Sequence, residues 1–156
     1  MRYNKVIFVC EDNLCRSPVA EAIMKSVNRC NGLTIESRGL IVLFPEPYNP
    51  KAASLLRNNG IILGNGESRQ LEDKDMGKDV LILAVDSHIK DKLSGSYPGA
   101  DNVYTIAEFA GAGEDVPDPY GADMEAYTKF YEQTDKLVKR AADRIYTIDT
   151  DNKEEL

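Results

Sequence analysis

The residues best suited to chemistry lie in one short segment, residues 9–18, which reads V-C-E-D-N-L-C-R-S-P. Five residues separate Cys10 from Arg16, and Ser17 follows. Five residues that return to the start of a helix can wrap around an anion, with their N–H groups inward and the helix dipole adding positive potential. A thiol at the base of such a loop loses its proton more easily than a free cysteine does. The spacing therefore predicts a thiolate nucleophile beneath a bound phosphate group.

Arg16 and Ser17 carry the side chains that such a reaction needs around the sulfur. The planar guanidinium of Arg16 can bind two phosphate oxygens at once, which a lysine cannot do. The Ser17 hydroxyl can donate a hydrogen bond to the Cys10 sulfur, as nucleophile and later as leaving group. The alternative is that Cys10 is an inert residue ending a buried strand, since free cysteines are often buried. The place of the motif between a strand and a helix favours the catalytic interpretation.

The elements that must position these residues alternate along the chain. Continuous apolar or β-branched runs predict strands at residues 5–9, 33–37, 80–85 and 102–105. Helical spacing of apolar residues predicts helices at residues 17–31, 50–59, 87–93 and 124–146. This rhythm indicates an α/β fold with a parallel sheet covered on both faces. Ligands of such sheets bind beyond the carboxyl ends of the strands, where the loop after Val9 lies.

Composition limits the class of protein and its partners. With 156 residues, 42% of them hydrophobic, the chain is expected to form one domain at residues 1–148, and the acidic tail at 149–156 is expected to fray. A net charge of −7 argues against binding of nucleic acid or of an anionic membrane. No apolar run approaches the ~20 residues that span a bilayer. We therefore expect a cytoplasmic protein with neither nucleic acid nor membrane among its partners.

The cysteines and the histidine favour neither a disulfide framework nor a metal site. The chain has three cysteines, an odd number, and no C-x-x-C pair. The chain has one histidine, His88, and three cysteines with this one histidine make a poor zinc site. No metal and no other cofactor are expected.

The segment around Cys10 resembles the V-C-x-G-N-x-C-R-S-P motif of the low-molecular-weight protein tyrosine phosphatase family. Similar segments continue from residue 4 to about residue 147: S-R-G at 37–39, N-P-K-A at 49–52, S-R-Q-L at 68–71, A-V-D at 84–86 and D-P-Y-G at 118–121. The resemblance implies a three-layer fold with a four-stranded parallel sheet and helices on both faces, the flavodoxin-like phosphatase fold. It also implies hydrolysis of phosphotyrosine and other aryl phosphate monoesters through a cysteinyl-phosphate intermediate. The expected partners are then a phosphorylated protein or peptide as substrate and inorganic phosphate as product.

The same resemblance supplies an acid for the leaving group. Cleavage of a phosphate ester needs a proton donor, and water must later be activated. In the family the aspartate of the D-P motif does both, which assigns the role to Asp118. By its residues alone, Asp118 is either a catalytic acid on the same edge as Cys10 or an ordinary turn aspartate. Tyr120 would form a wall of the pocket, and Phe44 would line its rim.

The residues between Cys10 and Arg16 are expected to form the phosphate site: Glu11, Asp12, Asn13, Leu14 and Cys15. Asn13 would hold the loop through side-chain hydrogen bonds to the loop backbone. Cys15 could form a protective disulfide with Cys10, or it could be a small residue at a helix start. Asp12 stands where the family has glycine, so we expect some strain from a left-handed backbone there. The Glu11 and Asp12 side chains are expected to point outward while their charges raise the Cys10 pKa.

Three other functions fit parts of this pattern. An arsenate reductase shares the fold and the cysteine loop, but thioredoxin-coupled members use later cysteines, and none follows Cys30. A protein arginine phosphatase belongs to the same family but has threonine at the position of Leu14, which suits an aromatic substrate better than a guanidinium. A weakly active phosphate-binding module is suggested by the acidic Glu11 and Asp12. Turnover of p-nitrophenyl phosphate separates an enzyme from such a module.

Overall fold

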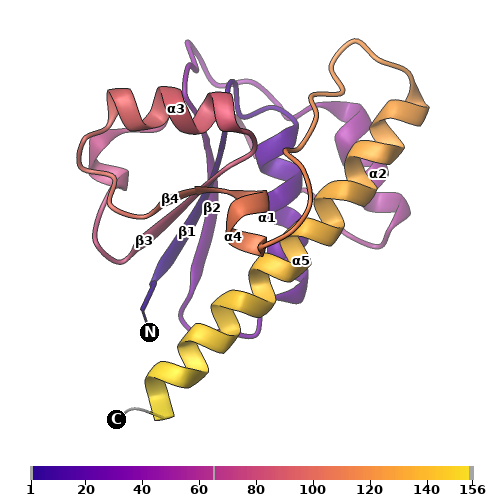
Figure 1. Cartoon of the computed structure of the whole chain (residues 1–156). Coiled ribbons are helices and arrows are strands. Elements are labelled where there is room, and N and C mark those ends of the chain that lie inside the picture. Colours follow the sequence, from indigo (N-terminus) through magenta and orange to yellow (C-terminus); the bar gives the residue numbers. More distant parts are fainter. Residues whose placement is uncertain (1, 65, 155–156) are drawn as a thin grey trace.

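A four-stranded parallel sheet forms the centre of the computed structural model, which describes residues 2–64 and 66–154 (Figure 1). Its strands stand in the order β2-β1-β3-β4. They are β1 (Lys5–Cys10), β2 (Thr34–Gly39), β3 (Val80–Ala84) and β4 (Val103–Thr105). The two central strands, β1 and β3, are buried almost throughout, as expected of strands with both faces covered. The predicted parallel sheet is confirmed.

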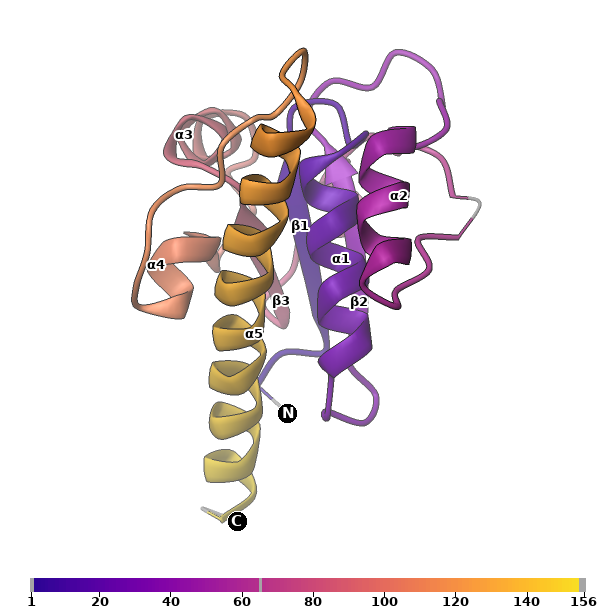
Figure 2. The same ribbon diagram turned by 90° about the vertical axis from the view of Figure 1, so that its right-hand side faces the viewer.

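Helices cover both faces of this sheet (Figures 1 and 2). The helices α1 (Arg16–Val27), α2 (Pro50–Asn58) and α5 (Met124–Glu154) lie on one face, where α1 packs against β1, β2 and α5. The helix α3 (Ser87–Ser96) lies on the other face, against β3 and β4. A short helix α4 (Ile106–Ala110) follows β4 and contacts α5, and a 3-10 turn, η1 (Asp73–Asp75), precedes β3. The arrangement is the expected three-layer α/β fold.

The register brings the carboxyl ends of the strands to one edge. Cys10 at the end of β1 pairs with Gly39 of β2, and Val9 pairs with Ala84 of β3. Beyond the strands, Val85 N donates to the carbonyl of Val9 at 3.1 Å, and Val116 N donates to the carbonyl of Val85 at 2.9 Å. The end of β1 and the segments that follow β3 and α4 are thus held side by side at this edge.

Several element boundaries differ from those predicted. The helix α1 ends at Val27 instead of residue 31, because Asn28 leaves the helix at ψ 131° and its Oδ1 accepts from Cys30 N at 2.9 Å. The helix α4 was not predicted from the sequence. It is only five residues long, and a capping box between Thr105 and Glu108 starts it.

The predicted acidic tail is helical over most of its length. The helix α5 runs on to Glu154 instead of ending at residue 146, and residues 155–156 lie outside the described part. Ile148 packs against the core and Asp149 is 5% exposed, so the inward-facing stripe continues past the expected end. The expectation of a frayed tail from Asp149 is therefore wrong as far as Glu154. None of the helices in the described ranges is long and apolar enough to cross a bilayer.

Candidate active site

The loop that joins β1 to α1 turns at Asn13, which has a left-handed backbone with φ 59°. Among the described residues Asn13 is the one non-glycine residue with a positive φ, so the strain expected at Asp12 lies one residue later. Asparagine is among the side chains that tolerate this conformation best. At the far end of the loop, the Cys15 side chain makes no capping hydrogen bond to α1. The first N–H groups of α1 are therefore not capped by that side chain and can serve an anion.

The fully buried Asn13 side chain joins the loop to two distant segments. Its Nδ2 donates to Ser17 Oγ and to Ser37 Oγ, both at 2.9 Å, and its Oδ1 accepts from Arg69 N at 2.9 Å. The expected side-chain bonds to the loop's own backbone are not what the structure has. Asn13 instead fixes the loop to β2 and to the segment after Ser68.

The Cys10 sulfur lies at the base of the loop, 2.9 Å from Ser17 Oγ and 3.3 Å from Asn13 N. Burial raises the pKa of the Cys10 thiol, the Ser17 hydrogen bonds lower it, Asp12 raises it and Arg16 lowers it. Burial prevails, so the expected net lowering of this pKa is not met. The sequence argument counted N–H groups and a guanidinium but not the loss of water around a residue that is 2% exposed.

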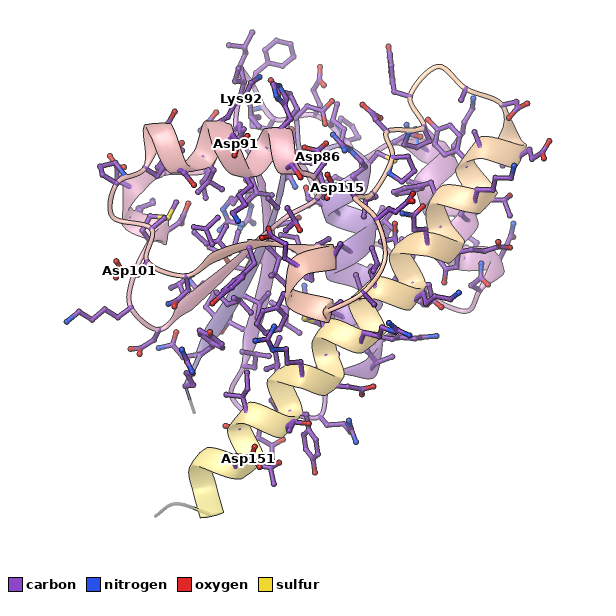
Figure 3. All side chains as sticks on the ribbon, viewed as in Figure 1. Asp86, Asp91, Lys92, Asp101, Asp115 and Asp151 are labelled. Carbon is purple, nitrogen blue, oxygen red and sulfur yellow. The ribbon has the colours of Figure 1, made fainter. Side chains whose placement is uncertain are left out.

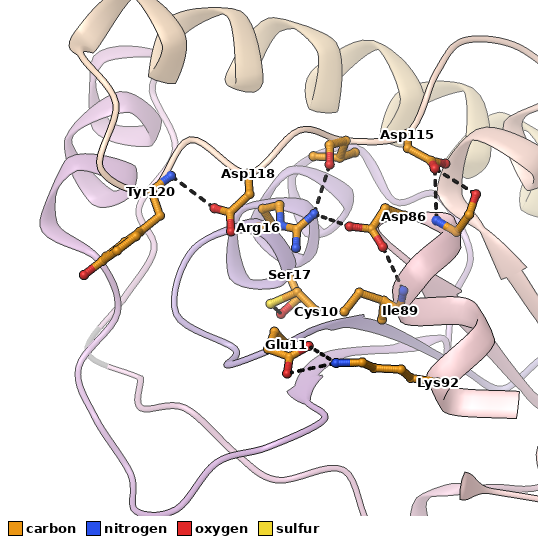
Figure 4. A network of polar contacts seen from close by, with 12 residues as sticks. Cys10, Glu11, Arg16, Ser17, Asp86, Ile89, Lys92, Asp115, Asp118 and Tyr120 are labelled. Carbon is orange, nitrogen blue, oxygen red and sulfur yellow. Dashed lines mark hydrogen bonds and ion pairs between the residues drawn. The ribbon is translucent and has the colours of Figure 1, made fainter. Parts of the chain in front are cut away.

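Arg16 is held against the sheet edge by its Nη1, which donates to Asp86 Oδ2 at 2.7 Å and to the carbonyl of Val116 at 3.0 Å (Figure 4). The other Asp86 oxygen accepts from Ile89 N at 2.8 Å and so caps α3. Burial opposes ionisation of Asp86, but the hydrogen bonds from Ile89 and Arg16 outweigh it and hold its pKa below 3.8. Asp86 is therefore a fixed carboxylate that orients the guanidinium beside Cys10.

The loop between α4 and α5 brings Asp118 beside Arg16, whereas Tyr120 extends away from Cys10 (Figure 4). Asp118 is exposed, and its Oδ1 accepts from Tyr120 N at 3.1 Å. The Tyr120 side chain is 83% exposed and does not wall the loop in this conformation. Asp118 thus lies at the edge at which Cys10 and Arg16 meet, and its role as an acid stays a prediction.

Phe44 lies at the rim of the loop, on a segment that is bonded to the loop itself. The backbone N–H groups of Leu40 and Ile41 donate to the carbonyls of Cys10 and Glu11 at 3.0 and 2.9 Å. Phe44 is 64% exposed, and it borders a hollow of about 170 Å³ together with Asp12. Phe44 therefore lies near the loop at Asp12, and its contact with a substrate stays a prediction.

The two acidic residues of the loop behave differently. Glu11 points away from the sulfur, with its carboxylate 3.4 Å from Lys92 Nζ on α3 (Figure 4). Asp12 turns inward, where its Oδ1 accepts from Leu14 N at 3.1 Å and lies 3.9 Å from the Cys10 sulfur. The expectation that both side chains point outward is correct for Glu11 and wrong for Asp12. An N–H group close to the Asp12 backbone attracts its carboxylate.

Cys15 is a second buried thiol close to the site. Burial raises its pKa to about 12, with Cys10, Asp118 and Asp12 adding to the effect. Cys10 and Cys15 are not joined by a disulfide in this structure, so the disulfide between them stays a prediction. Within the described ranges, no group of three His, Cys, Asp or Glu side chains is placed as metal ligands would be.

Four residues of the site received no role from sequence reasoning: Ser37, Gly39, Arg69 and Asp86. Gly39 packs so closely on the loop that a Cβ there would lie 2.8 Å from the carbonyl carbon of Asp12 and 3.0 Å from Asn13 N. The short motifs S-R-G, S-R-Q-L and A-V-D contain these residues and were the available signal. Asp86 also lies at the carboxyl edge of the sheet, with Asp115 and Lys92, far from Asp151 at the other end of the molecule (Figure 3).

Comparison with known proteins places this geometry in context. The family model described as "Low molecular weight phosphotyrosine protein phosphatase" matches residues 5–153. The low molecular weight protein-tyrosine-phosphatase PtpB of Staphylococcus haemolyticus is 30% identical over 129 residues, covering 83% of this chain and 91% of that protein. A solved low molecular weight protein tyrosine phosphatase from T. tengcongensis has 33% identity and a TM-score of 0.81, covering 90% and 98% of the two chains.

A solved arginine phosphatase is similar to the same extent. The arginine phosphatase YwlE from Geobacillus stearothermophilus has 28% identity and a TM-score of 0.86, covering 94% of this chain and 96% of its own. Similarity in fold and sequence therefore extends both to tyrosine phosphatases and to an arginine phosphatase.

Proposed function

Because the chain belongs to the low molecular weight phosphotyrosine protein phosphatase family, we propose that it hydrolyses phosphotyrosine in proteins or peptides. One observation carries the proposal: the Cys10 sulfur lies 2.9 Å from the Ser17 hydroxyl beneath a loop whose far end is the start of α1. A buried sulfur with such a donor, beside an anchored guanidinium, suits in-line attack on a phosphate ester.

In the first step Cys10, whose thiol has lost its proton to water, attacks phosphorus as a thiolate. The S–P bond forms as the bond from phosphorus to the phenolic oxygen breaks, and Asp118 gives its proton to the departing oxygen. Arg16, held by Asp86 and Val116, binds the equatorial phosphoryl oxygens without having to be ordered first. The products are a free tyrosine side chain and a cysteinyl phosphate.

In the second step water attacks the cysteinyl phosphate. Asp118, now a carboxylate, accepts the proton of the water as its oxygen bonds to phosphorus. The S–P bond breaks, and the thiolate that leaves accepts hydrogen bonds from Ser17 Oγ and Asn13 N. Asn13 Nδ2 donates to Ser17 Oγ, so the Ser17 proton is available for the sulfur. Inorganic phosphate leaves, and the enzyme returns to its starting state.

Leu14 supports an aromatic substrate over an arginine. Its half-buried apolar side chain stands in the loop at the position where the arginine phosphatases carry a hydroxyl residue. An apolar side chain packs on an aromatic ring but offers no hydrogen bond to a guanidinium. Phosphoarginine remains the alternative substrate, given the similarity to the arginine phosphatase.

The test compares a phosphotyrosine peptide, the matched phosphoarginine peptide and p-nitrophenyl phosphate. We expect kcat/KM for phosphotyrosine to exceed that for phosphoarginine at least ~tenfold, and Asp118→Asn to lower kcat about 100-fold or more. Cys10→Ser and Arg16→Lys should abolish turnover. Faster hydrolysis of phosphoarginine would assign the chain to the arginine phosphatases. Phosphate binding without any turnover would identify a binding module.

A further inference from the structure

The Asp12 carboxylate occupies a place where the proposed function needs a phosphoryl oxygen. Its Oδ1 accepts the N–H of Leu14 at 3.1 Å and lies 3.9 Å from the Cys10 sulfur. In a substrate poised for attack, phosphorus stands about 3–3.5 Å from the nucleophile, and its oxygens lie little farther away. The carboxylate is thus an anion bound to one of the loop N–H groups, at the distance from sulfur expected of a ligand oxygen.

The charges around Asp12 do not compensate for its own. Arg16 is paired with Asp86 at 2.7 Å, and Lys92 is paired with Glu11 at 3.4 Å. Among the ion pairs of the described residues, none includes Asp12. Its side chain is exposed, so it can rotate out of the loop into water without disturbing the core.

We propose that Asp12 is an intramolecular competitor for the phosphate loop. In the unliganded protein its carboxylate takes the Leu14 N–H, and it must leave before a phosphate dianion binds. This role rests on the proposed function, which defines the loop as a phosphate site. Asp12 thereby weakens the binding of inorganic phosphate and limits inhibition by this product.

A purely structural role for Asp12 makes the opposite prediction for its variants. If the hydrogen bond of Asp12 only shapes the loop, Asp12→Ala leaves the Leu14 N–H without a fixed orientation and so weakens phosphate binding. Asp12→Asn keeps an oxygen that can accept from Leu14 but removes the charge, so it would be neutral under that role. Under the competitor role both variants bind phosphate more tightly, because a dianion no longer meets a carboxylate.

The experiment is calorimetric titration of the full chain with inorganic phosphate at constant ionic strength. We expect Asp12→Asn and Asp12→Ala each to lower the Kd about tenfold. The control is Asp91→Asn, which removes one negative charge from the exposed side of α3 at the same end of the molecule (Figure 3). It should change the Kd by less than about twofold, because an exposed charge outside the loop is screened by water and salt.

The outcomes separate this inference from the proposed function. If the Kd for phosphate in both Asp12 variants is equal to or higher than in the wild type, the competitor role is wrong. It is also wrong if Asp91→Asn lowers the Kd as much as the Asp12 variants do. Turnover of p-nitrophenyl phosphate by the wild type is measured in parallel. If the wild type turns over and the Kd values of the Asp12 variants are unchanged, the competitor role is wrong and the proposed phosphatase activity stands. If the Asp12 variants bind phosphate more tightly but the wild type does not turn over, the competitor role is supported and the proposed phosphatase activity is wrong.

Discussion

At the scale of single residues, the reactivity of Cys10 depends on groups that act in opposite directions. Burial raises its pKa, and Asp12 adds to this, while the Ser17 hydrogen bonds and Arg16 lower it. Of these groups, only the Asp12 carboxylate can be removed without creating a cavity in the core and without loss of a hydrogen-bond donor to the sulfur. It is therefore the residue whose substitution should change the nucleophile most cleanly.

We predict that Asp12→Gly lowers the pKa of Cys10. Removal of a carboxylate 3.9 Å from the sulfur favours the thiolate, so at a pH below the thiol pKa the variant should react faster. The measurement is the rate of iodoacetamide alkylation against pH, followed on the Cys10 peptide. Cys15 does not interfere at neutral pH, because its pKa is about 12. A midpoint in Asp12→Gly at or above that of the wild type contradicts the prediction.

Contacts between residues that are close in the chain could be predicted, and contacts that depend on folding could not. Cys10, Arg16 and Ser17 are close in the chain, so their spacing alone predicts a loop around an anion. Asp86 meets Arg16 across 70 positions, and Arg69 meets Asn13 across 56, and no local pattern reports such contacts. The inward turn of the Asp12 side chain depends on where the Leu14 N–H points, which only the folded loop defines.

At the scale of elements, the start of α3 and the position of Arg16 depend on the same side chain. Asp86 caps α3 through one carboxylate oxygen and holds Arg16 through the other. The most strongly apolar strand of the sheet, β3, ends two residues before it and fixes its position. A helix cap can thus serve as a positioning residue for the site.

We predict that Asp86→Asn impairs catalysis more than it impairs α3. Asparagine is a good helix cap, but it lacks the charge that holds the guanidinium, so kcat/KM should fall about tenfold. Asp86→Ala should also lose the cap, at an additional cost of ~1 kcal/mol in the free energy of unfolding. Equal kcat/KM in Asp86→Asn and the wild type would show that Arg16 is positioned without this carboxylate.

The same pair of variants has a defined pH dependence. The pKa of Asp86 lies below 3.8, so its carboxylate stabilises the folded state above that pH. The contribution is lost as the pH falls through the lowered folded-state pKa. Urea denaturation should therefore show a larger deficit of Asp86→Asn at neutral pH than at about pH 3. A deficit that does not change with pH would contradict this linkage.

The end of β2 packs against the loop after Cys10 through Gly39, a residue without a side chain. We predict that Gly39→Ala lowers kcat/KM at least ~tenfold, because its Cβ would press on backbone atoms of Asp12 and Asn13 that cannot yield without moving the loop. Gly95→Ala in α3 is the matched control, since a Cβ there meets nothing within 4 Å. It should leave kcat/KM unchanged and stabilise the helix by ~0.5–1 kcal/mol. An active Gly39→Ala variant would show that the loop tolerates displacement.

At the scale of the whole molecule, the alternation of elements predicted the sheet and its layers, whereas the ends of helices were less predictable. A parallel sheet follows from buried apolar runs separated by helices, and every strand was found within a residue or two of its expected place. The helix α5 exceeds its predicted end because its inward stripe includes a buried aspartate, Asp149, which an apolar pattern cannot count. The charged residues from Asp149 onward suggested a tail, but in the structure they continue helix α5 as far as Glu154.

The site and the end of α5 lie at opposite ends of the molecule, which separates their effects on function (Figure 3). We predict that a chain ending at residue 148 keeps the kcat/KM of the full chain toward p-nitrophenyl phosphate at 25 °C. It should lose stability, because the deletion removes the buried Asp149 and the last turns of α5, and we expect Tm to fall by a few degrees, about 2–6 °C. Differential scanning calorimetry and steady-state kinetics on the same preparation test both parts.

The control is Leu137→Ala, which creates a cavity under the middle of α5 and should lower Tm more than the deletion does. A deletion that lowers kcat/KM while leaving Tm unchanged would mean that the far end of α5 communicates with the Cys10 loop, against the separation seen in the fold.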